Sequence, residues 1–226
     1  MFLKEYLLVT TPISQSLNLL QCEEEAFLGV LLPTLSLTLK QLKDLEGSVT
    51  VCSPLLDILL QSVRKRFAPQ YKDSECMLAS TFHPNFKLAW LDLLAEFDYD
   101  VDEMKRRVTA DMILLVDKCL MDEKNCDVTN DACDFSNEGK KRRSAIAEDL
   151  VESFLSIKTP DAKLTKDVFP HRCFRDLFVK FNTPIPASAA IEGLFTLDDA
   201  LIKPKQPGLS DQHFGMLAFL KSNAGD

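Results

Sequence analysis

Carboxylates are the side chains of this chain that could support metal-dependent chemistry. Glu192 lies in a short apolar segment, Asp198 and Asp199 follow it, and Asp117 ends the apolar run Met112-Ile-Leu-Leu-Val. A catalytic Mg²⁺ needs several converging oxygen ligands, which Glu192 alone does not provide. We therefore interpret Glu192 as vestigial or structural and the adjacent acids as solvated or capping. The helical periodicity around Asp117 argues against a strand that ends in a catalytic acid.

Cysteine and histidine could in principle form a zinc site. The candidate residues are Cys119, Cys126, Cys133, His171 and Cys173. None of the cysteines has the short Cys-x-x-Cys spacing of a zinc knuckle, so we interpret them as unligated thiols in a reducing compartment. His83 precedes a proline, which predicts a structural or exposed turn residue, and His213 is expected on the surface of a helix. No nucleophile motif or glycine-rich phosphate loop occurs, so we expect no cofactor, no metal and no enzymatic activity.

The basic run Lys140, Lys141, Arg142 and Arg143 stands out in an acidic chain. It is interpreted as a nuclear localisation signal, as a weak phosphate contact or as a solvated loop. The formal net charge is -8 and the pI is about 5.0. Such a surface repels phosphate, so direct nucleic-acid binding is doubtful. We expect the nucleus or the cytoplasm, with the nucleus favoured.

The elements that position these residues are predicted to be mainly helical. The chain has 226 residues, of which 46% are hydrophobic, enough for a sizeable core in one or two domains. No signal peptide and no run long enough to cross a membrane is recognised. Pro12 is expected to kink or split the first helix, and Pro33 is expected to bend the second or to mark a second helix start. The periodicity predicts helices over 3–21, 24–46, 53–67, 101–120, 145–157 and 171–181, a short strand over 77–82, and a mobile polar loop over 122–143.

The last part of the chain carries an apolar surface of its own. We expect it to build either an internal core or a subunit interface, because apolar faces that lack cover tend to become interfaces. The residues concerned are Leu194, Phe195, Leu197, Leu201, Ile202, Phe214, Leu217, Phe219 and Leu220.

Several segments together resemble the hAT superfamily of transposases. The strongest are Asn182-Thr-Pro-Ile-Pro, the helix from Ala187 to Phe195, Lys203-Pro-Lys, and Leu209-Ser-Asp before a final helix. Earlier segments are similar to hAT-derived proteins that carry BED zinc fingers: Phe2-Leu-Lys-Glu-Tyr, Thr11-Pro-Ile-Ser-Gln-Ser-Leu, Gly29-Val-Leu-Leu-Pro-Thr-Leu and Phe82-His-Pro-Asn-Phe-Lys-Leu-x-Trp.

The resemblance implies an RNase H-like core interrupted by a helical insertion. Residues 1–121 would resemble the insertion, 122–143 a flexible acidic and basic loop, and 144–226 the C-terminal dimerisation region. Glu192 would occupy the position of the third metal-binding acid, while the two aspartates and the zinc finger would precede this chain. Gly193 and Thr196 depart from the family, which commonly has Arg and Ser there.

We therefore expect an inactive assembly module that associates with itself or with related hAT-derived proteins. One alternative is a subunit of a metal-dependent DNA transposase or nuclease completed by another chain. A second is a DNA-associated regulatory protein that acts through a partner with a BED finger. A third is a gene fragment that folds poorly, because its helices lack the sheet against which they should pack.

Overall fold

The computed structural model describes residues 2–22, 27–126, 137–157 and 168–183. All regular secondary structure in these ranges is helical, which confirms the mainly α fold class. The helices are α1 (Phe2–Leu20), α2 (Leu28–Asp44), α3 (Ser53–Phe67), α4 (Ser74–Phe82), α5 (Ala89–Asp92), α6 (Val101–Cys126), α7 (Asn137–Ser156) and α8 (Arg172–Asn182).

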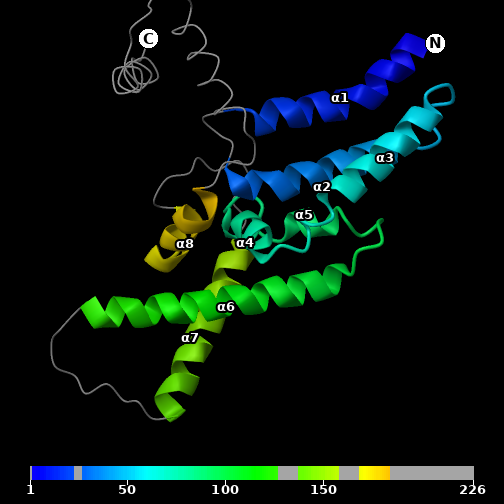
Figure 1. Ribbon diagram of the computed structural model, residues 1–226. Helices are drawn as coiled ribbons and strands as arrows, with labels where there is room; N and C mark the ends of the chain where they lie inside the picture. Colours follow the sequence, from blue (N-terminus) through cyan, green and yellow to red (C-terminus); the bar gives the residue numbers. More distant parts are fainter. Residues whose placement is uncertain (1, 23–26, 127–136, 158–167, 184–226) are drawn as a thin grey trace, which may run out of the picture.

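Helix α2 is the centre of the arrangement. It packs against α1, α3, α4, α5 and α8, and most of its side chains are buried. Figure 1 shows α1 as the outermost helix on one side of α2, with α6 and α7 on the other side, beyond α4. A helix that is apolar on nearly every side requires such enclosure, which explains why the other elements gather around it.

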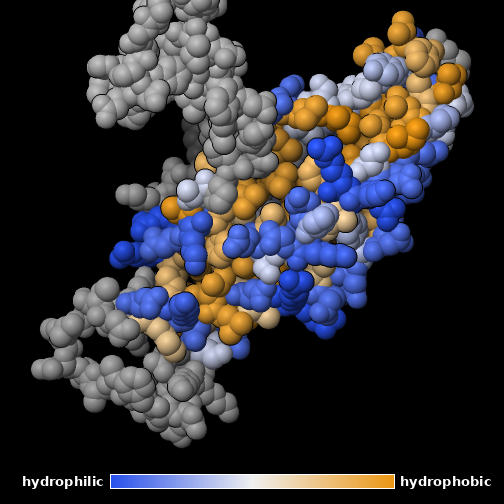
Figure 2. Space-filling view, viewed as in Figure 1, coloured by the Kyte–Doolittle hydropathy of each residue, from blue (hydrophilic) through white to orange (hydrophobic). Residues whose placement is uncertain are grey.

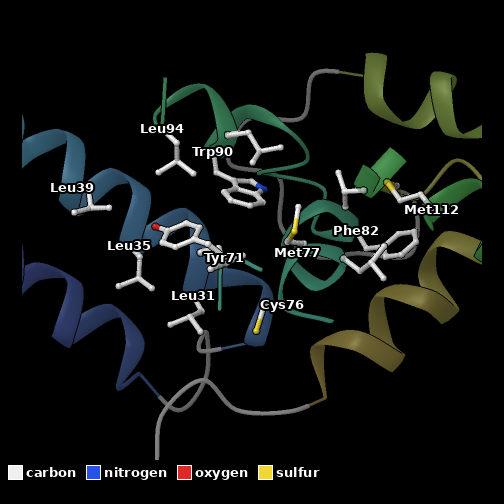
Figure 3. Packing of buried hydrophobic residues seen from close by; sticks show 14 of the residues in the cluster. Leu31, Leu35, Leu39, Tyr71, Cys76, Met77, Phe82, Trp90, Leu94 and Met112 are labelled. Carbon is white, nitrogen blue, oxygen red and sulfur yellow. The ribbon is translucent and has the colours of Figure 1, made fainter. Parts of the chain in front are cut away.

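The core is one continuous cluster that runs from Val9 in α1 to Phe178 in α8. Figure 3 shows Tyr71 and Trp90 facing each other beside Leu31, Leu35 and Leu39 of α2. Burial raises the pKa of Tyr71, and its hydroxyl pairs with that of Ser36 at 3.2 Å. Helices α7 and α8 contribute to the same cluster, so the predicted boundary after residue 121 does not separate two hydrophobic cores.

The predicted strand over 77–82 is wrong, because this segment belongs to α4. A short apolar run without clear periodicity fits a buried helix as well as a strand. The side chain of Asp73 caps the helix by accepting hydrogen bonds from the backbone N–H groups of Glu75 and Cys76. Inside the helix, Ser80 and Thr81 donate their hydroxyls to carbonyls one turn earlier, which lets them be buried.

The predicted loop over 122–143 is also wrong at both ends. Helix α6 continues to Cys126, and α7 begins at Asn137. Low apolar content suggested a loop, but Glu, Lys and Arg have good helix propensity.

Proline does not split either of the first two helices. Helix α1 runs through Pro12, and α2 runs through Pro33 after starting at Leu28, with Phe27 extended before it. Each proline removes one backbone hydrogen bond. Both prolines are buried, so packing of the helices compensates for the missing bond.

Candidate functional site

The predicted interface of the C-terminal segment lies outside the described residues. The same holds for Glu192, for Asp198 and Asp199, and for His213 and Cys133. The interface residues concerned are Leu194, Phe195, Leu197, Leu201, Ile202, Phe214, Leu217, Phe219 and Leu220. Lys140, Lys141, Arg142 and Arg143 belong to α7, so this basic run is helical rather than part of a loop.

The metal candidates within the described ranges do not assemble into a site. In that part of the chain, no group of three or more His, Cys, Asp or Glu side chains could hold a metal ion. His171 instead caps α8, where its Nδ1 accepts a hydrogen bond of 3.2 Å from the backbone N–H of Cys173. Asp117 lies within α6, which confirms that it does not end a strand.

An apolar surface on α1 is the most prominent unexplained feature of the described chain. We name it the α1 surface and define it by exposed side chains on one flank of the helix, which are Phe2, Leu3, Tyr6, Leu7 and Leu17. Leu3 is 71% exposed and Leu7 is 62% exposed. Figure 2 shows apolar side chains gathered over the N-terminal end of α1 and beside it. Contiguous apolar patches of this kind mark association sites more often than isolated exposed leucines do.

The helix that carries this surface is firmly attached through its other face. Val9 and Pro12 are buried where α1 packs against α2. The hydroxyl of Ser16 is paired with that of Thr38 in α2. The α1 surface is therefore presented by a fixed helix rather than by a frayed chain end.

Glu5 fixes the N-terminal end of α1 to the start of α3. One carboxylate oxygen accepts hydrogen bonds from the backbone N–H groups of Thr50, Val51 and Cys52, at 3.0, 2.7 and 3.0 Å. The bond from Cys52 is the largest cause that lowers the pKa of Glu5, and burial opposes it. A carboxylate at the N-terminus of a helix satisfies unpaired N–H groups and the helix dipole.

A second anchor holds α8, the helix that leads into the C-terminal segment. The Oδ1 atom of Asn182 accepts a hydrogen bond of 2.7 Å from the backbone N–H of Gly29. Its Nδ2 atom donates to the carbonyl of Ala79 at 3.2 Å. One buried amide thus joins α8 to both α2 and α4, and the chain enters residues 184–226 next to the start of α2.

The turn from His83 to Lys87 is buried between α4, α7 and α8. His83 stacks near Phe86 and Phe178, and burial lowers its pKa to about 4. The ammonium of Lys87 lies 4.8 Å from the ring centre of Phe154 and donates to the carbonyl of Ile157. His83 is only 4% exposed, so the predicted alternative of an exposed position is wrong. Its burial between aromatic rings agrees with the predicted structural role.

The lysine in this turn has a structural explanation. Ile157 directly follows α7, so the cation of Lys87 meets the negative end of that helix. Burial lowers the pKa of Lys87, and the Phe154 ring offsets part of that cost. The φ angle of Lys87 is 49°, and this left-handed geometry closes the turn.

Sequence reasoning missed the α1 surface as a candidate site, although a signal was present. Leucines at positions 3, 7, 8, 17, 19 and 20 are too widely spread around the helix for one neighbour to cover them. Lys4 and Glu5 are the charged residues among positions 2–20. That pattern indicates a helix with two apolar sides.

Comparison of the chain with models of protein families, with curated proteins and with solved structures gave no match. Among the helices of the described chain, none is long and apolar enough to cross a membrane.

Proposed function

We propose that this chain is an inactive protein-association module derived from a hAT-superfamily transposase. The observation that carries this proposal is the α1 surface, where large apolar side chains stand exposed on a helix fixed by Glu5 and Val9. An apolar face held rigidly in solvent is suited to binding a partner, because little ordering entropy is lost when it docks.

The resemblance to hAT proteins adds a second association element. The predicted C-terminal interface, with Phe195 and Phe219, corresponds to the dimerisation region of the family and comes after α8 in the sequence. In this proposal, residues 1–121 derive from the helical insertion, and the C-terminal part is a remnant of the RNase H-like core. The partners are a second copy of the chain or related hAT-derived proteins, in the nucleus or the cytoplasm, with the nucleus favoured.

The first test is the molar mass of the purified chain, measured by light scattering over a concentration series, with circular dichroism on the same samples. A helical, discrete oligomer is expected. A helical species that stays monomeric up to the highest concentration would contradict self-association. An aggregate with little helix would identify a fragment that does not fold stably.

The C-terminal element has its own test. The double substitution Phe195→Asp and Phe219→Asp is expected to weaken self-association while the helix content stays unchanged. An unchanged molar mass with the fold retained would reject these two residues as interface residues.

A further inference from the structure

We propose that the α1 surface is a symmetric interface at which α1 pairs with α1 of a second copy, with the two helices antiparallel. This inference rests on the proposed function and specifies where and how the chain associates. The C-terminal segment would then strengthen the dimer rather than form its first contact.

The geometry of the helix places the relevant side chains on one stripe. Residues three or four positions apart in a helix lie on the same side. One such series shares a flank of α1 and consists of Leu3, Tyr6, Leu7, Thr10, Ser14 and Leu17. The hydroxyl of Thr10 donates to the carbonyl of Tyr6 at 2.8 Å, so its bond is made within the helix. The rings of Phe2 and Tyr6 lie close together, with 6.0 Å between their centres.

The size of the α1 surface matches what a stable dimer needs. Its five side chains are between 44% and 71% exposed. With leucine at the lower end of the range of roughly 150–250 Å² that aromatic side chains offer, the exposed area of the five is about 500 Å². A standard interface buries about 800 Å² per partner, of which roughly 60% is apolar. The α1 surface thus supplies the apolar part of one standard interface.

The charge pattern favours a second copy as the occupant. The stripe contains no charged residue, and depletion of charge is typical of an interface core. Glu5 is occupied by the start of α3, and Lys4, the other charged residue of α1, forms no ion pair with the described residues. A charged partner would therefore gain little at this surface, whereas an identical apolar stripe is complementary to it.

The helix dipoles favour the antiparallel arrangement. Parallel helices would place two positive helix ends side by side. Antiparallel helices bring each positive end beside the negative C-terminal end of the partner helix. With the two-fold axis beside Thr10, Leu3 of one copy meets Leu17 of the partner subunit.

The test compares the double variant Leu7→Glu and Leu17→Glu with the matched control Leu114→Glu. Leu114 is 68% exposed on α6, away from α1, so it tests the effect of a new surface charge alone. The α1 variant is expected to raise the dimer dissociation constant by at least about 100-fold. The control is expected to dimerise like the wild type. All three chains should keep their helix content, and their thermal midpoints should agree at concentrations where the wild type is monomeric.

The outcomes separate the interface from the proposed function. A monomeric wild type would refute the symmetric interface and self-association, and would leave association with related proteins as the remaining form of the proposed function. A dimeric wild type with an unaffected α1 variant would refute the interface and leave association to the C-terminal segment. A thermal midpoint that is lower in the variant even at concentrations where the wild type is monomeric would overturn the proposal too, because it would mean that the chain itself covers this surface. If the glutamate variant does not fold, the milder pair Leu7→Ser and Leu17→Ser gives the same comparison.

The orientation is tested by oxidative cross-linking of a Thr10→Cys variant, with the wild type as background for the native cysteines. A cross-linked dimer specific to the variant is expected, since antiparallel pairing brings the two Thr10 positions together at the axis. A Leu3→Cys variant should not cross-link to itself. Efficient cross-linking through position 3 instead of position 10 would refute the antiparallel arrangement.

Discussion

The side-chain carbonyl of Asn182 accepts a hydrogen bond of 2.7 Å from the backbone N–H of Gly29, across 153 positions of sequence. The same amide donates to the carbonyl of Ala79, so one residue ties the last described helix to the two helices at the centre of the fold. Asn182 is 4% exposed, which means that water cannot replace these bonds. This contact therefore fixes the position of the end of α8, after which residues 184–226 follow in the sequence.

Replacement of Asn182 by Ala is expected to destabilise the protein by about 2–4 kcal/mol. It leaves the Gly29 N–H and the Ala79 carbonyl buried without a partner, and each unpaired group costs about 1–3 kcal/mol. Chemical unfolding followed by circular dichroism measures the change. The matched control is Asn18→Ala on the exposed side of α1, which should change stability by less than about 0.5 kcal/mol. Equal effects of the two variants would show that the buried amide is not a structural anchor.

Gly29 is expected to reject any larger side chain. A Cβ atom there would lie 2.5 Å from the Ala79 carbonyl oxygen and would also collide with Oδ1 of Asn182. We expect Gly29→Ala to cost about 1–3 kcal/mol, as overpacked cores do. Gly47 provides the contrast, since its φ angle is +79° but a Cβ atom at this position would meet open space. Gly47→Ala should cost about 1 kcal/mol and Gly47→Asn less, because asparagine tolerates this backbone.

The stability of the fold should fall between pH 6.5 and 4 because of His83. Burial lowers the pKa of this imidazole from 6.5 to about 4, so the unfolded chain binds a proton in this range and the folded chain does not. The contribution of His83 to the free energy of unfolding is fully present above pH 6.5. Roughly 3 kcal/mol of it is lost as the pH falls from 6.5 through 4.

Denaturant unfolding at pH 7 and pH 5 tests this prediction. In a His83→Gln variant, the difference in unfolding free energy between the two pH values should become much smaller. Glu5 and Asp73 do not interfere with this comparison above pH 4.5. Their pKa values are lowered in the folded protein from 4.5 and 3.8, so both side chains stay largely ionised in this range, folded or unfolded. An identical pH dependence in the variant and the wild type would show that His83 is not the group responsible.

Glu5 should make the attachment of α1 sensitive to acid below pH 4.5. Its pKa is lowered in the folded state, so its contribution is present above 4.5 and is lost as the pH falls through the lowered value. Glu5→Gln should increase hydrogen exchange in α1 and at the start of α3 at pH 7. The control Glu152→Gln, on the exposed side of α7, should leave exchange there unchanged. Unaltered protection of α1 in the Glu5 variant would contradict the anchor.

The long helices were predictable because their apolar residues repeat with the period of a helix over several turns. Residues 53–67 match α3 from end to end, and the predictions for 101–120 and 145–157 lie inside α6 and α7, apart from the final residue of the second range. Segment 77–82 was not predictable in this way. Buried on all sides, it shows no amphipathic pattern, and its hydroxyls are satisfied by bonds that become visible only in the fold.

The candidate site was less predictable than the fold. Periodicity identified Leu3, Leu7 and Leu17 as residues of an amphipathic helix, but it does not say which flank a neighbour covers. Glu5 and Pro12 lie on the buried side of α1, where a sequence pattern would place neither of them. Glu5 is buried because the start of α3 offers three N–H groups to one carboxylate oxygen.

The sequence by itself determined the helical class, the acidic surface and the excess of leucine in the first helix, because composition and periodicity are local properties of the chain. The tertiary structure decided which leucines remain exposed, that His83 and Asn182 are buried, and that the ends of 122–143 are helical. These outcomes depend on contacts between residues far apart in the chain, such as Asn182 with Gly29, and local pattern carries no information about them.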